Sequence, residues 1–262
     1  MPVEGAQRPL PVDLTGLRVA ITAGAGGIGR VIADYFAAQG ALPFVSDVDE
    51  AALAACPHPA MRADAGSAGE LDAFIDAAGT HLGGLDVLVN NAGIAGPTAP
   101  VEDVEPEALD ATLRINLTSM FHCARQAVPL LRAAGGGSIV NLSSAAGKFG
   151  FPLRSPYAAA KWGVIGFTRT LAMELGPDAI RVNAILPGLV DGPRIRRVLR
   201  AKAEARGVSD NEQTRAALET VSLRCFVTQG DIANMALYLC SPFGATITGQ
   251  ALSVDGGLEG LP

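Results

Sequence analysis

The sequence predicts a single α/β domain in which a doubly wound parallel sheet is flanked by helices on both faces. Its 262 residues suit one large domain. Hydrophobic residues make up 49% of the chain and charged residues 18%, so a sizeable core can be buried. Short runs that are apolar on both faces alternate with longer segments of helical spacing, which is typical of a covered parallel sheet. We therefore expect ligands to bind at the carboxyl ends of the strands.

In the first half of the chain, apolar runs end in turns and helical patterns follow them. The helix after the first strand is expected to end at Gly40, because glycine commonly terminates helices. The strands expected here are 17–22, 41–47 and 85–93. The helices expected here are 28–39, 49–55, 68–82 and 105–133. Residues 1–15 contain three prolines and are expected to be a flexible lead-in, so that the domain is 16–262.

The second half of the chain continues the alternation. The strands expected here are 135–144, which has a glycine-rich entry, 180–188 and 250–257. A helix over 156–175 has Ser155 as its N-cap and Pro156 in its first turn. Residues 193–221 are charged and helical in pattern, and 230–240 is the last expected helix. The long segment 189–226 is the expected substrate loop.

The charge and the cysteine content exclude several classes of protein. A net charge of −6 argues against nucleic-acid binding, which needs clustered Lys and Arg. No apolar run reaches the roughly 18 residues of a membrane span, and the N-terminus lacks a signal-peptide pattern. The four cysteines are far apart, which fits reduced thiols in the cytoplasm better than a zinc site or a disulfide framework. We therefore expect a cytoplasmic protein with neither a membrane nor a metal partner.

The first strand leads into a glycine-rich turn, TAGAGGIG at 22–29. Glycines let the backbone approach a pyrophosphate, and the helix that follows offers free N–H groups and the positive end of its dipole. The candidate contacts are Gly24, Gly27, Ile28 and Gly29. Methyltransferases and flavoproteins have similar turns, so the turn alone leaves the ligand open. The strand before it, the helix after it and an acid at the end of the next strand favour a dinucleotide.

That acid is Asp47, eighteen residues after Gly29. A carboxylate at this place accepts hydrogen bonds from the ribose hydroxyls of NAD and repels the 2′-phosphate of NADP. No Arg or Lys occurs in 22–29 or 41–61 to hold that phosphate, and Arg30 is the nearest cation. We therefore expect NAD as the cofactor.

Tyr157 and Lys161 lie four residues apart in the helix 156–175, so their side chains share one face. A tyrosine hydroxyl with a pKa near 10 is a weak base at neutral pH, and a nearby ammonium lowers that pKa because it favours the phenolate. Tyr157 can then act as a general base toward an alcohol or a general acid toward a carbonyl. Ser144, thirteen residues upstream at the end of a strand, can orient the substrate oxygen, and Ser143 competes for this role.

With these motifs the chain resembles the short-chain dehydrogenase/reductase family, in the subfamily of about 250 residues. The resemblance covers residues 14–258. It rests on ordered motifs, which are TAGAGGIG at 22–29, Asp47, Asp64, NNAG at 90–93, Asn116, Ser144, YxxxK at 157–161, PG at 187–188 and ITGQALSVDGG at 247–257. It implies a Rossmann-type fold, hydride transfer with a nicotinamide cofactor, and a homotetramer, with a homodimer as the second choice.

The resemblance also implies roles for individual residues. The catalytic set would be Asn116, Ser144, Tyr157 and Lys161, in which Asn116 holds a water that links Lys161 to solvent; the spacing of Ser144 from Tyr157 decides between the two serines. Tyr157 and Lys161 would also contact the cofactor. The other cofactor contacts would be Asp64 and Ala65 at the adenine, Asn90, Ala92 and Gly93 at the nicotinamide ribose, Ile28 near the pyrophosphate and nicotinamide, and Pro187, Gly188 and Val190 at the nicotinamide ring.

Two positions depart from the family pattern. Ala23 stands where the family has the first glycine of TGxxxGxG, and we expect its methyl group to be tolerated with an ordinary negative φ. Gly192 stands where the family often has a threonine that bonds the carboxamide. We expect that contact to come from the backbone or from Val190.

The expected function is an NAD-dependent oxidoreductase that interconverts a secondary alcohol and its ketone. Substrate contacts are expected from Ser144 and Tyr157, and from Arg154 or Arg194 if the substrate is anionic or polyhydroxylated. A mobile lid with a solvated basic face is the other interpretation of these arginines, and an apolar substrate also stays open. The alternatives are an NADPH-dependent carbonyl or 3-oxoacyl reductase, and a redox-silent dinucleotide sensor or scaffold that would have no need of the catalytic four.

Overall fold

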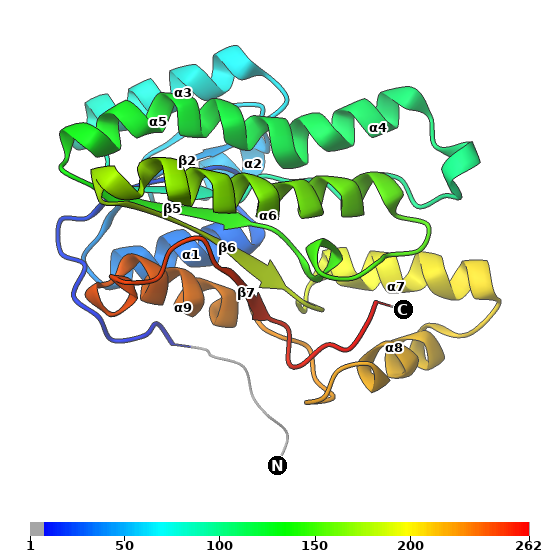
Figure 1. Ribbon diagram of the computed structural model, residues 1–262. Coiled ribbons are helices and arrows are strands. Elements are labelled where there is room, and N and C mark those ends of the chain that lie inside the picture. Colours follow the sequence, from blue (N-terminus) through cyan, green and yellow to red (C-terminus); the bar gives the residue numbers. More distant parts are fainter. Residues whose placement is uncertain (1–7, 262) are drawn as a thin grey trace.

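The computed structural model describes residues 8–261, and seven parallel strands within them form one sheet (Figure 1). Its strands are β1 (Arg18–Ile21), β2 (Leu42–Asp47), β3 (Ala60–Arg62), β4 (Val87–Asn90), β5 (Gly137–Leu142), β6 (Ile180–Pro187) and β7 (Ala251–Val254). Their order in the sheet is β3-β2-β1-β4-β5-β6-β7. The direction of winding reverses between β1 and β4, and such a switch point opens a crevice at the carboxyl ends of the strands.

The register of the central strands brings their carboxyl ends to one level. Ile21, the last residue of β1, is paired with Val45 of β2 on one side and with Val89 of β4 on the other. The residues that follow β1, β2 and β4 therefore emerge together at one edge of the sheet.

Helices cover both faces of the sheet. They are α1 (Gly27–Ala38), α2 (Glu50–Ala54), α3 (Ala68–Leu82), α4 (Pro106–Leu113), α5 (Ser119–Ala133), α6 (Ser155–Leu175), α7 (Pro193–Arg206), α8 (Asp210–Glu219) and α9 (Gln229–Cys240). Figure 1 shows α3, α5 and α6 on one side of the sheet and α1 and α9 on the other. Two apolar layers result, one around Phe74, Met120 and Val164 and the other around Phe36 and Ile232. The predicted fold class is confirmed.

Three local features differ from the expectation. The sequence did not predict β3, which has three residues, only partly buried, and pairs with β2 at the edge of the sheet. The expected helix 105–133 is interrupted by a π-helical turn, Arg114–Thr118. The helical pattern over 193–221 forms two helices, because Gly207 adopts a left-handed φ of 65° and Ser209 then caps α8.

The expectation of a flexible lead-in is wrong for residues 8–15. The N–H of Leu10 donates to Asn234 Oδ1 at 2.6 Å, and that of Val12 donates to Gln39 Oε1 at 3.0 Å. Val12 and Leu14 are buried in the layer that contains α1 and α9. This segment is thus part of the packed domain, whereas residues 1–7 lie outside the described residues.

Within residues 8–261, no helix combines the length and the hydrophobicity that a membrane span requires. The same part of the chain holds no group of three or more His, Cys, Asp or Glu side chains that could bind a metal ion. All four cysteines lie in it and carry free thiols.

Candidate active site

A cavity of about 660 Å³ opens at the carboxyl ends of the strands. Twelve of the nineteen residues that the sequence marks as site candidates line it, namely Gly27, Ile28, Asp47, Gly93, Ser144, Arg154, Tyr157, Lys161, Pro187, Gly188, Val190 and Arg194. The other seven do not line it, namely Gly24, Gly29, Asp64, Ala65, Asn90, Ala92 and Asn116.

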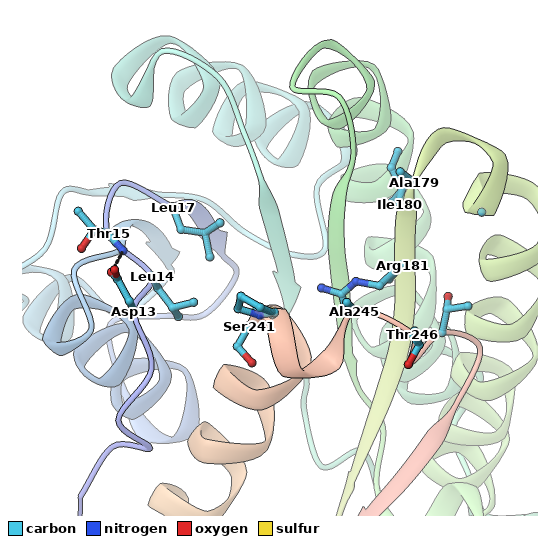
Figure 2. A pocket seen from close by; sticks show the side chains of 14 residues that line it. Asp13, Leu14, Thr15, Leu17, Ala179, Ile180, Arg181, Ser241, Ala245 and Thr246 are labelled. Atoms are coloured by element: carbon cyan, nitrogen blue, oxygen red, sulfur yellow. Dashed lines mark hydrogen bonds between the residues drawn. The ribbon is translucent and has the colours of Figure 1, made fainter.

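A second cavity, of about 640 Å³, lies at the opposite edge of the sheet (Figure 2). It is lined by residues next to the amino ends of β1 and β6, among them Asp13, Leu17 and Arg181. The Arg181 guanidinium is already bound, because it donates to the carbonyls of Leu239 and Gly244. None of the described residues that line this second cavity is a site candidate, so the first cavity is the candidate active site.

The glycine-rich turn is shaped by close contacts on one side and by open space on the other. A Cβ at Gly29 would lie 2.3 Å from the carbonyl oxygen of Ala23, and one at Gly24 would lie 2.8 Å from Cβ of Val45. At Gly27, in contrast, a Cβ would meet nothing within 4 Å, and this residue lines the cavity. Gly24 and Gly29 let the turn pack closely against its neighbours, and Gly27 leaves space for a ligand.

The N-terminus of α1 faces this space with its backbone N–H groups. Its N-cap is Gly26, no side chain caps the helix, and the first turn carries no acid. Free N–H groups and the positive end of a helix dipole attract phosphate. The chain thus fits the diphosphate of a dinucleotide here, with Gly26, Gly27 and Ile28 as the residues that would hold it.

Ala23 differs from the expectation, because its φ is +49° rather than negative. This is the left-handed region, in which a side chain costs roughly 1–2 kcal/mol. The family's glycine would adopt it freely. The turn therefore has a backbone conformation that suits glycine, and the methyl group of Ala23 makes this conformation strained.

The loop after β4 locks the glycine-rich turn through Asn91, a residue that the sequence analysis did not single out. Its Nδ2 donates to the carbonyls of Thr22 and Ala23 at 3.1 and 2.9 Å. Thr22 Oγ1 in turn accepts from the N–H groups of Asn91 and Ala92, both at 3.0 Å. The NNAG motif marks this loop, although a motif does not reveal which of two adjacent asparagines reaches the turn.

Asn90 is placed differently from the expectation. Its side chain is buried, and its Nδ2 donates to Asn141 Oδ1 on β5 at 2.8 Å. The side chain therefore lies between two strands and not in the cavity. Ala92 is buried as well, so of the three candidates in this loop Gly93 alone lines the cavity.

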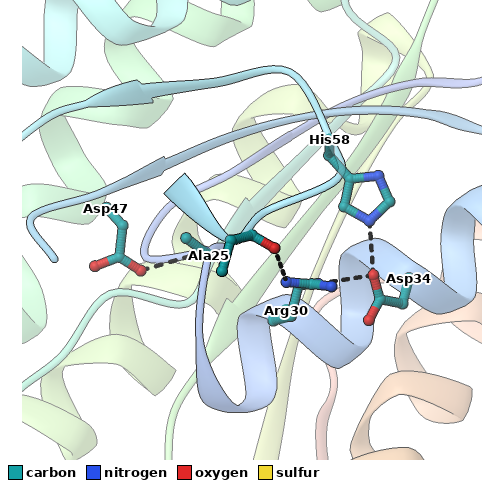
Figure 3. A network of polar contacts seen from close by, with 6 residues as sticks. Ala25, Arg30, Asp34, Asp47 and His58 are labelled. Atoms are coloured by element: carbon teal, nitrogen blue, oxygen red, sulfur yellow. Dashed lines mark hydrogen bonds and ion pairs between the residues drawn. The ribbon is translucent and has the colours of Figure 1, made fainter. Parts of the chain in front are cut away.

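Asp47 ends β2 and lines the cavity beside the glycine-rich turn. Its Oδ1 accepts from the N–H groups of Val48 and Asp49, and its Oδ2 accepts from that of Ala25 at 3.2 Å (Figure 3). A carboxylate oxygen can accept two hydrogen bonds, so Oδ2 keeps room for a ligand hydroxyl.

Arg30 is held away from Asp47 by its own partners. Its Nε bonds Asp34 Oδ1 at 2.9 Å, and its Nη1 donates to the carbonyl of Ala55 at 3.3 Å. His58 contacts the same Asp34 oxygen at 2.7 Å, as Figure 3 shows. Arg30 is therefore engaged in a surface ion pair, and Arg62, which is in register with Asp47 on β3, pairs with Glu70 at 2.9 Å.

Asp64 and Ala65 lie outside the cavity. Asp64 Oδ1 accepts from the N–H of Gly66 at 2.7 Å, and its own N–H donates to Glu70 Oε2 at 3.0 Å. Ala65 packs against the apolar layer that contains α3. These bonds shape the turn after β3, and an adenine contact at this turn stays a prediction.

Lys161 is buried on α6, 3% exposed. Its Nζ donates to the carbonyl of Leu142 at 2.8 Å and lies 5.6 Å from the centre of the Tyr157 ring. Burial, and secondarily the charge of Arg194, lower the pKa of Lys161 to about 7. The structure thus holds an amine that titrates near neutral pH close to the tyrosine.

The two serines after β5 differ in their bonds. Ser143 Oγ donates to the carbonyl of Lys161 at 2.8 Å, which uses its only proton. Ser144 Oγ accepts from the N–H of Ala146 at 3.1 Å, which leaves its own proton available to a ligand. The geometry favours Ser144 over Ser143 as a substrate contact.

Asn116 lies in the π-helical turn and is fully buried. Its Nδ2 donates to the carbonyls of Thr112 and Ile94 at 2.9 and 3.1 Å, whereas its Oδ1 is buried and finds no partner within residues 8–261. A Cβ at Gly93 would lie 2.6 Å from that Oδ1 and 3.6 Å from Lys161 Nζ. Asn116 itself does not line the cavity. Its Oδ1 comes close to Lys161 because Gly93, which lies between them, has no side chain.

Arg154 and Arg194 line the cavity near Tyr157 from different elements. Arg154 immediately precedes α6, is 2% exposed and donates to the carbonyl of Ala95 at 2.5 Å. Arg194, in the first turn of α7, donates to the carbonyl of Gly93 at 2.8 Å. These two predicted substrate contacts thus line the same cavity as Ser144 and Tyr157.

The known proteins that this chain resembles are reductases and dehydrogenases. A family model described as enoyl-(acyl carrier protein) reductase matches residues 22–259. D-beta-hydroxybutyrate dehydrogenase of Cupriavidus necator is 35% identical over 254 residues, which are 93% of this chain and 98% of that protein.

Two solved structures extend the comparison. Xylitol dehydrogenase bound to NAD⁺ has a TM-score of 0.86 at 28% identity and covers 93% of this chain and 99% of its own. An actinorhodin polyketide ketoreductase with NADPH has a TM-score of 0.88 at 32% identity and covers 94% and 99%. The related structures thus include complexes with NAD⁺ and with NADPH, and the relatives named here differ in the alcohols on which they act.

Proposed function

Because the chain belongs to the short-chain dehydrogenase/reductase family, we propose that it is an NAD-dependent dehydrogenase that interconverts a secondary alcohol and its ketone. As a member it is an oxidoreductase that acts on CH–OH groups with a nicotinamide dinucleotide. One observation carries the proposal: Ser144, Tyr157 and Lys161 line the same cavity as the open N-terminus of α1.

The chain's own residues would handle the proton of the alcohol. The Ser144 hydroxyl would donate to the substrate oxygen and hold it beside Tyr157. The Tyr157 oxygen would accept the hydroxyl proton, and a protonated Lys161 would stabilise the resulting charge distribution electrostatically. The bound nicotinamide supplies the acceptor for a hydride from the carbinol carbon, so that the alcohol loses one proton and one hydride and becomes a ketone.

Asn116 would complete a proton path to solvent. Its buried Oδ1 has no partner among the described residues, and a buried acceptor of this kind is normally satisfied by a donor such as ordered water. It lies close to Lys161, which supports the role that the family resemblance implies for it.

Preference for NAD is proposed from the surroundings of Asp47. Its carboxylate would accept from the adenosine ribose and repel a 2′-phosphate, and Arg30 is engaged by Asp34. The second candidate, an NADPH-dependent carbonyl or 3-oxoacyl reductase, is supported by the NADPH-bound ketoreductase relative and opposed by this charge. A redox-silent sensor would explain the cavity but not the arrangement of Ser144, Tyr157 and Lys161.

A homotetramer is proposed as the assembly, with a homodimer as the second choice. Apolar side chains are exposed along α5 and α6, among them Phe121, Trp162 and Met173, the last of which is 82% exposed. A second copy would cover such a face. Light scattering tests this proposal, and a monomeric mass would contradict it. The cytoplasm is the proposed location, because free thiols persist in a reducing compartment.

The test of the function is absorbance at the reduced-nicotinamide band. The purified protein would be given NAD⁺ or NADP⁺ with polyols, aldoses, hydroxy acids, hydroxysulfonates and apolar secondary alcohols. Turnover with NAD⁺ on one chemical class supports the proposal. Turnover with NADP⁺ alone would overturn the cofactor preference, and NADH binding without any turnover would favour the sensor.

A further inference from the structure

Two arginines line the cavity that Tyr157 also lines, and a buried lysine lies close to one of them. Arg154 has its Cζ 5.2 Å from the centre of the Tyr157 ring and 5.2 Å from that of Phe151. Lys202 of α7 is 7% exposed, and its Nζ lies 4.4 Å from the centre of the same Phe151 ring. Arg194 lines the cavity beside them. We call Arg154, Arg194 and Lys202 the cation cluster; the sequence analysis had not included Lys202.

The carboxylates that line the cavity lie elsewhere or are engaged. Asp47 and Asp49 follow β2, at the end of the cavity where the glycine-rich turn lies. Asp191 lines the cavity but pairs with Arg196 at 3.0 Å. Within residues 8–261, neither Arg154 nor Arg194 has an ion pair with a carboxylate, and Arg154 Nε is buried without a hydrogen-bond partner. The end of the cavity beside Tyr157 is therefore strongly cationic.

Burial and neighbouring cations disfavour charge in the cluster. Burial lowers the pKa of Arg154; Tyr157 opposes this shift, and the charge of Arg194 adds to it. Burial also lowers the pKa of Lys202 to about 8, with the charge of Arg154 as the next cause. Buried like charges are unfavourable, and a ligand that carries a negative charge would relieve the repulsion between the two arginines.

We propose that the cation cluster binds the carboxylate of the substrate, so that this protein acts on a short hydroxy acid whose carbinol lies at Tyr157. The inference rests on the function proposed above and names its substrate class. Arg154 is the principal ligand, and Arg194 and Lys202 add charge.

The form of the Arg154 site fits a carboxylate. A guanidinium is planar and offers N–H groups in a fixed fork that matches two carboxylate oxygens, and here the Nε end of the fork has no protein partner. The backbone turn at Arg154 determines where this side chain begins. In that turn Leu153 has a left-handed φ of 64°, and the N–H of Arg154 donates to the carbonyl of Phe151 at 3.1 Å. The first turn of α6 follows directly, and its positive dipole end adds to the attraction.

The size of the cavity limits the substrate to a small molecule. Cavities of about 300–1,000 Å³ normally hold one ligand, and this one, at about 660 Å³, must hold a dinucleotide as well. The open N-terminus of α1 offers a separate site for the phosphates of the cofactor, so the cluster is not needed to hold them. The anion that would bind the cation cluster is therefore a negatively charged group of the substrate.

The first experiment compares matched substrates on the wild-type protein with NAD⁺. Short 2-, 3- and 4-hydroxy acids are each assayed beside their methyl esters, the corresponding sulfonates and neutral secondary alcohols. We expect kcat/KM for the best acid to exceed that for its ester by about 10- to 100-fold, because hydrogen bonds to charged groups are the strong ones.

The second experiment changes the cluster. Arg154→Gln should lower kcat/KM for the acid by about 10- to 100-fold more than it lowers kcat/KM for neutral alcohols, and Arg154→Lys should restore part of the loss. The control is Arg200→Gln, which removes an exposed charge of α7 that pairs with Asp210 and should change neither value. Calorimetric binding of the unreactive parent carboxylic acid to the NADH-loaded protein gives a readout without turnover.

The outcomes separate this inference from the proposed function. Equal rates on acid and ester, unaffected by Arg154→Gln, would overturn the carboxylate site and leave the dehydrogenase standing. A preference for the sulfonate would also overturn it. Carboxylate binding that depends on Arg154, without turnover of any alcohol, would support the site and overturn the function. If the protein neither binds the carboxylic acid nor prefers the hydroxy acid to its ester, the inference is wrong.

Discussion

Lys161 Nζ donates to the carbonyl oxygen of Leu142, the last residue of β5, at 2.8 Å. This bond joins α6 to the strand that ends beside Ser144, and it fixes the amine on the side where Tyr157 lies. A neutral amine can donate this bond as well as an ammonium, so the anchor persists when Lys161 titrates.

The stability of the cofactor-free protein should depend on pH through Lys161. Burial lowers its pKa to about 7 in the folded state from 10.5, so between these values the unfolded chain binds more protons and stability rises with pH. Below pH 7 both states are protonated and the contribution is at its least favourable. Urea unfolding of the wild type and of Lys161→Met should show a free-energy difference that moves in favour of the wild type from pH 7 to 10. A difference independent of pH would contradict this.

Tyr157→Phe should abolish turnover without loss of the cofactor. Removing a positioned general acid–base typically lowers kcat by about 10²- to 10⁴-fold, while the ring, which Arg154 and Lys161 flank, stays in place. Initial rates and NADH fluorescence measure the two effects. Tyr238→Phe on α9 is the matched control, and it should behave as the wild type. Turnover that survives Tyr157→Phe would refute the mechanism.

Asp47→Ala should reduce the preference for NAD⁺ over NADP⁺. The substitution removes both an acceptor for the ribose and a charge that repels the 2′-phosphate, so the ratio of the two kcat/KM values should fall by about tenfold or more. Asp103→Ala removes an equal charge from an exposed position and should leave the ratio unchanged. A ratio that does not respond to Asp47→Ala would exclude this carboxylate from cofactor selection.

Ala23→Gly should raise the free energy of unfolding. The left-handed φ of +49° at Ala23 costs roughly 1–2 kcal/mol with a side chain, while the added freedom of the unfolded glycine chain costs about 0.4–1 kcal/mol. A net gain of up to about 1.6 kcal/mol should follow in urea titrations. Ala25→Gly in the same turn, where φ is not positive, should destabilise instead. A loss at Ala23 as large as that at Ala25 would contradict the strain.

The sequence predicted the elements that carry strong periodicity, and the exceptions have physical causes. The edge strand β3 has three residues and little burial, so its backbone pairing with β2 leaves no pattern of side chains. The π-helical turn at Arg114–Thr118 interrupts a segment whose apolar spacing continues across it. Residues 8–15 carry prolines, yet Val12 and Leu14 find apolar partners that only the assembled domain provides.

Site residues that belong to a known motif could be predicted from the sequence. Site residues whose position depends on tertiary packing could not. Ser144, Tyr157 and Lys161 line one cavity as expected. The side chain of Asn90 does not line the cavity, because its amide donates to Asn141 on the neighbouring strand. These two residues are 51 positions apart in the sequence, and motif spacing does not reveal such a pair. Lys202 joins the cluster through the packing of α7, whose charged sequence looks the same as that of a solvated helix.

The bonds between Thr22 and the loop after β4 have a consequence for the order of folding. They span 69 and 70 residues, so the full set of bonds that hold the glycine-rich turn exists only once β4 has joined β1. A nascent chain that has emerged only as far as α2 has the whole phosphate-binding motif and its bonds to Ser46 and Asp47, but not the bonds from the loop after β4. The order of this local motif therefore depends on a long-range pairing of strands, which a larger domain forms late in its folding.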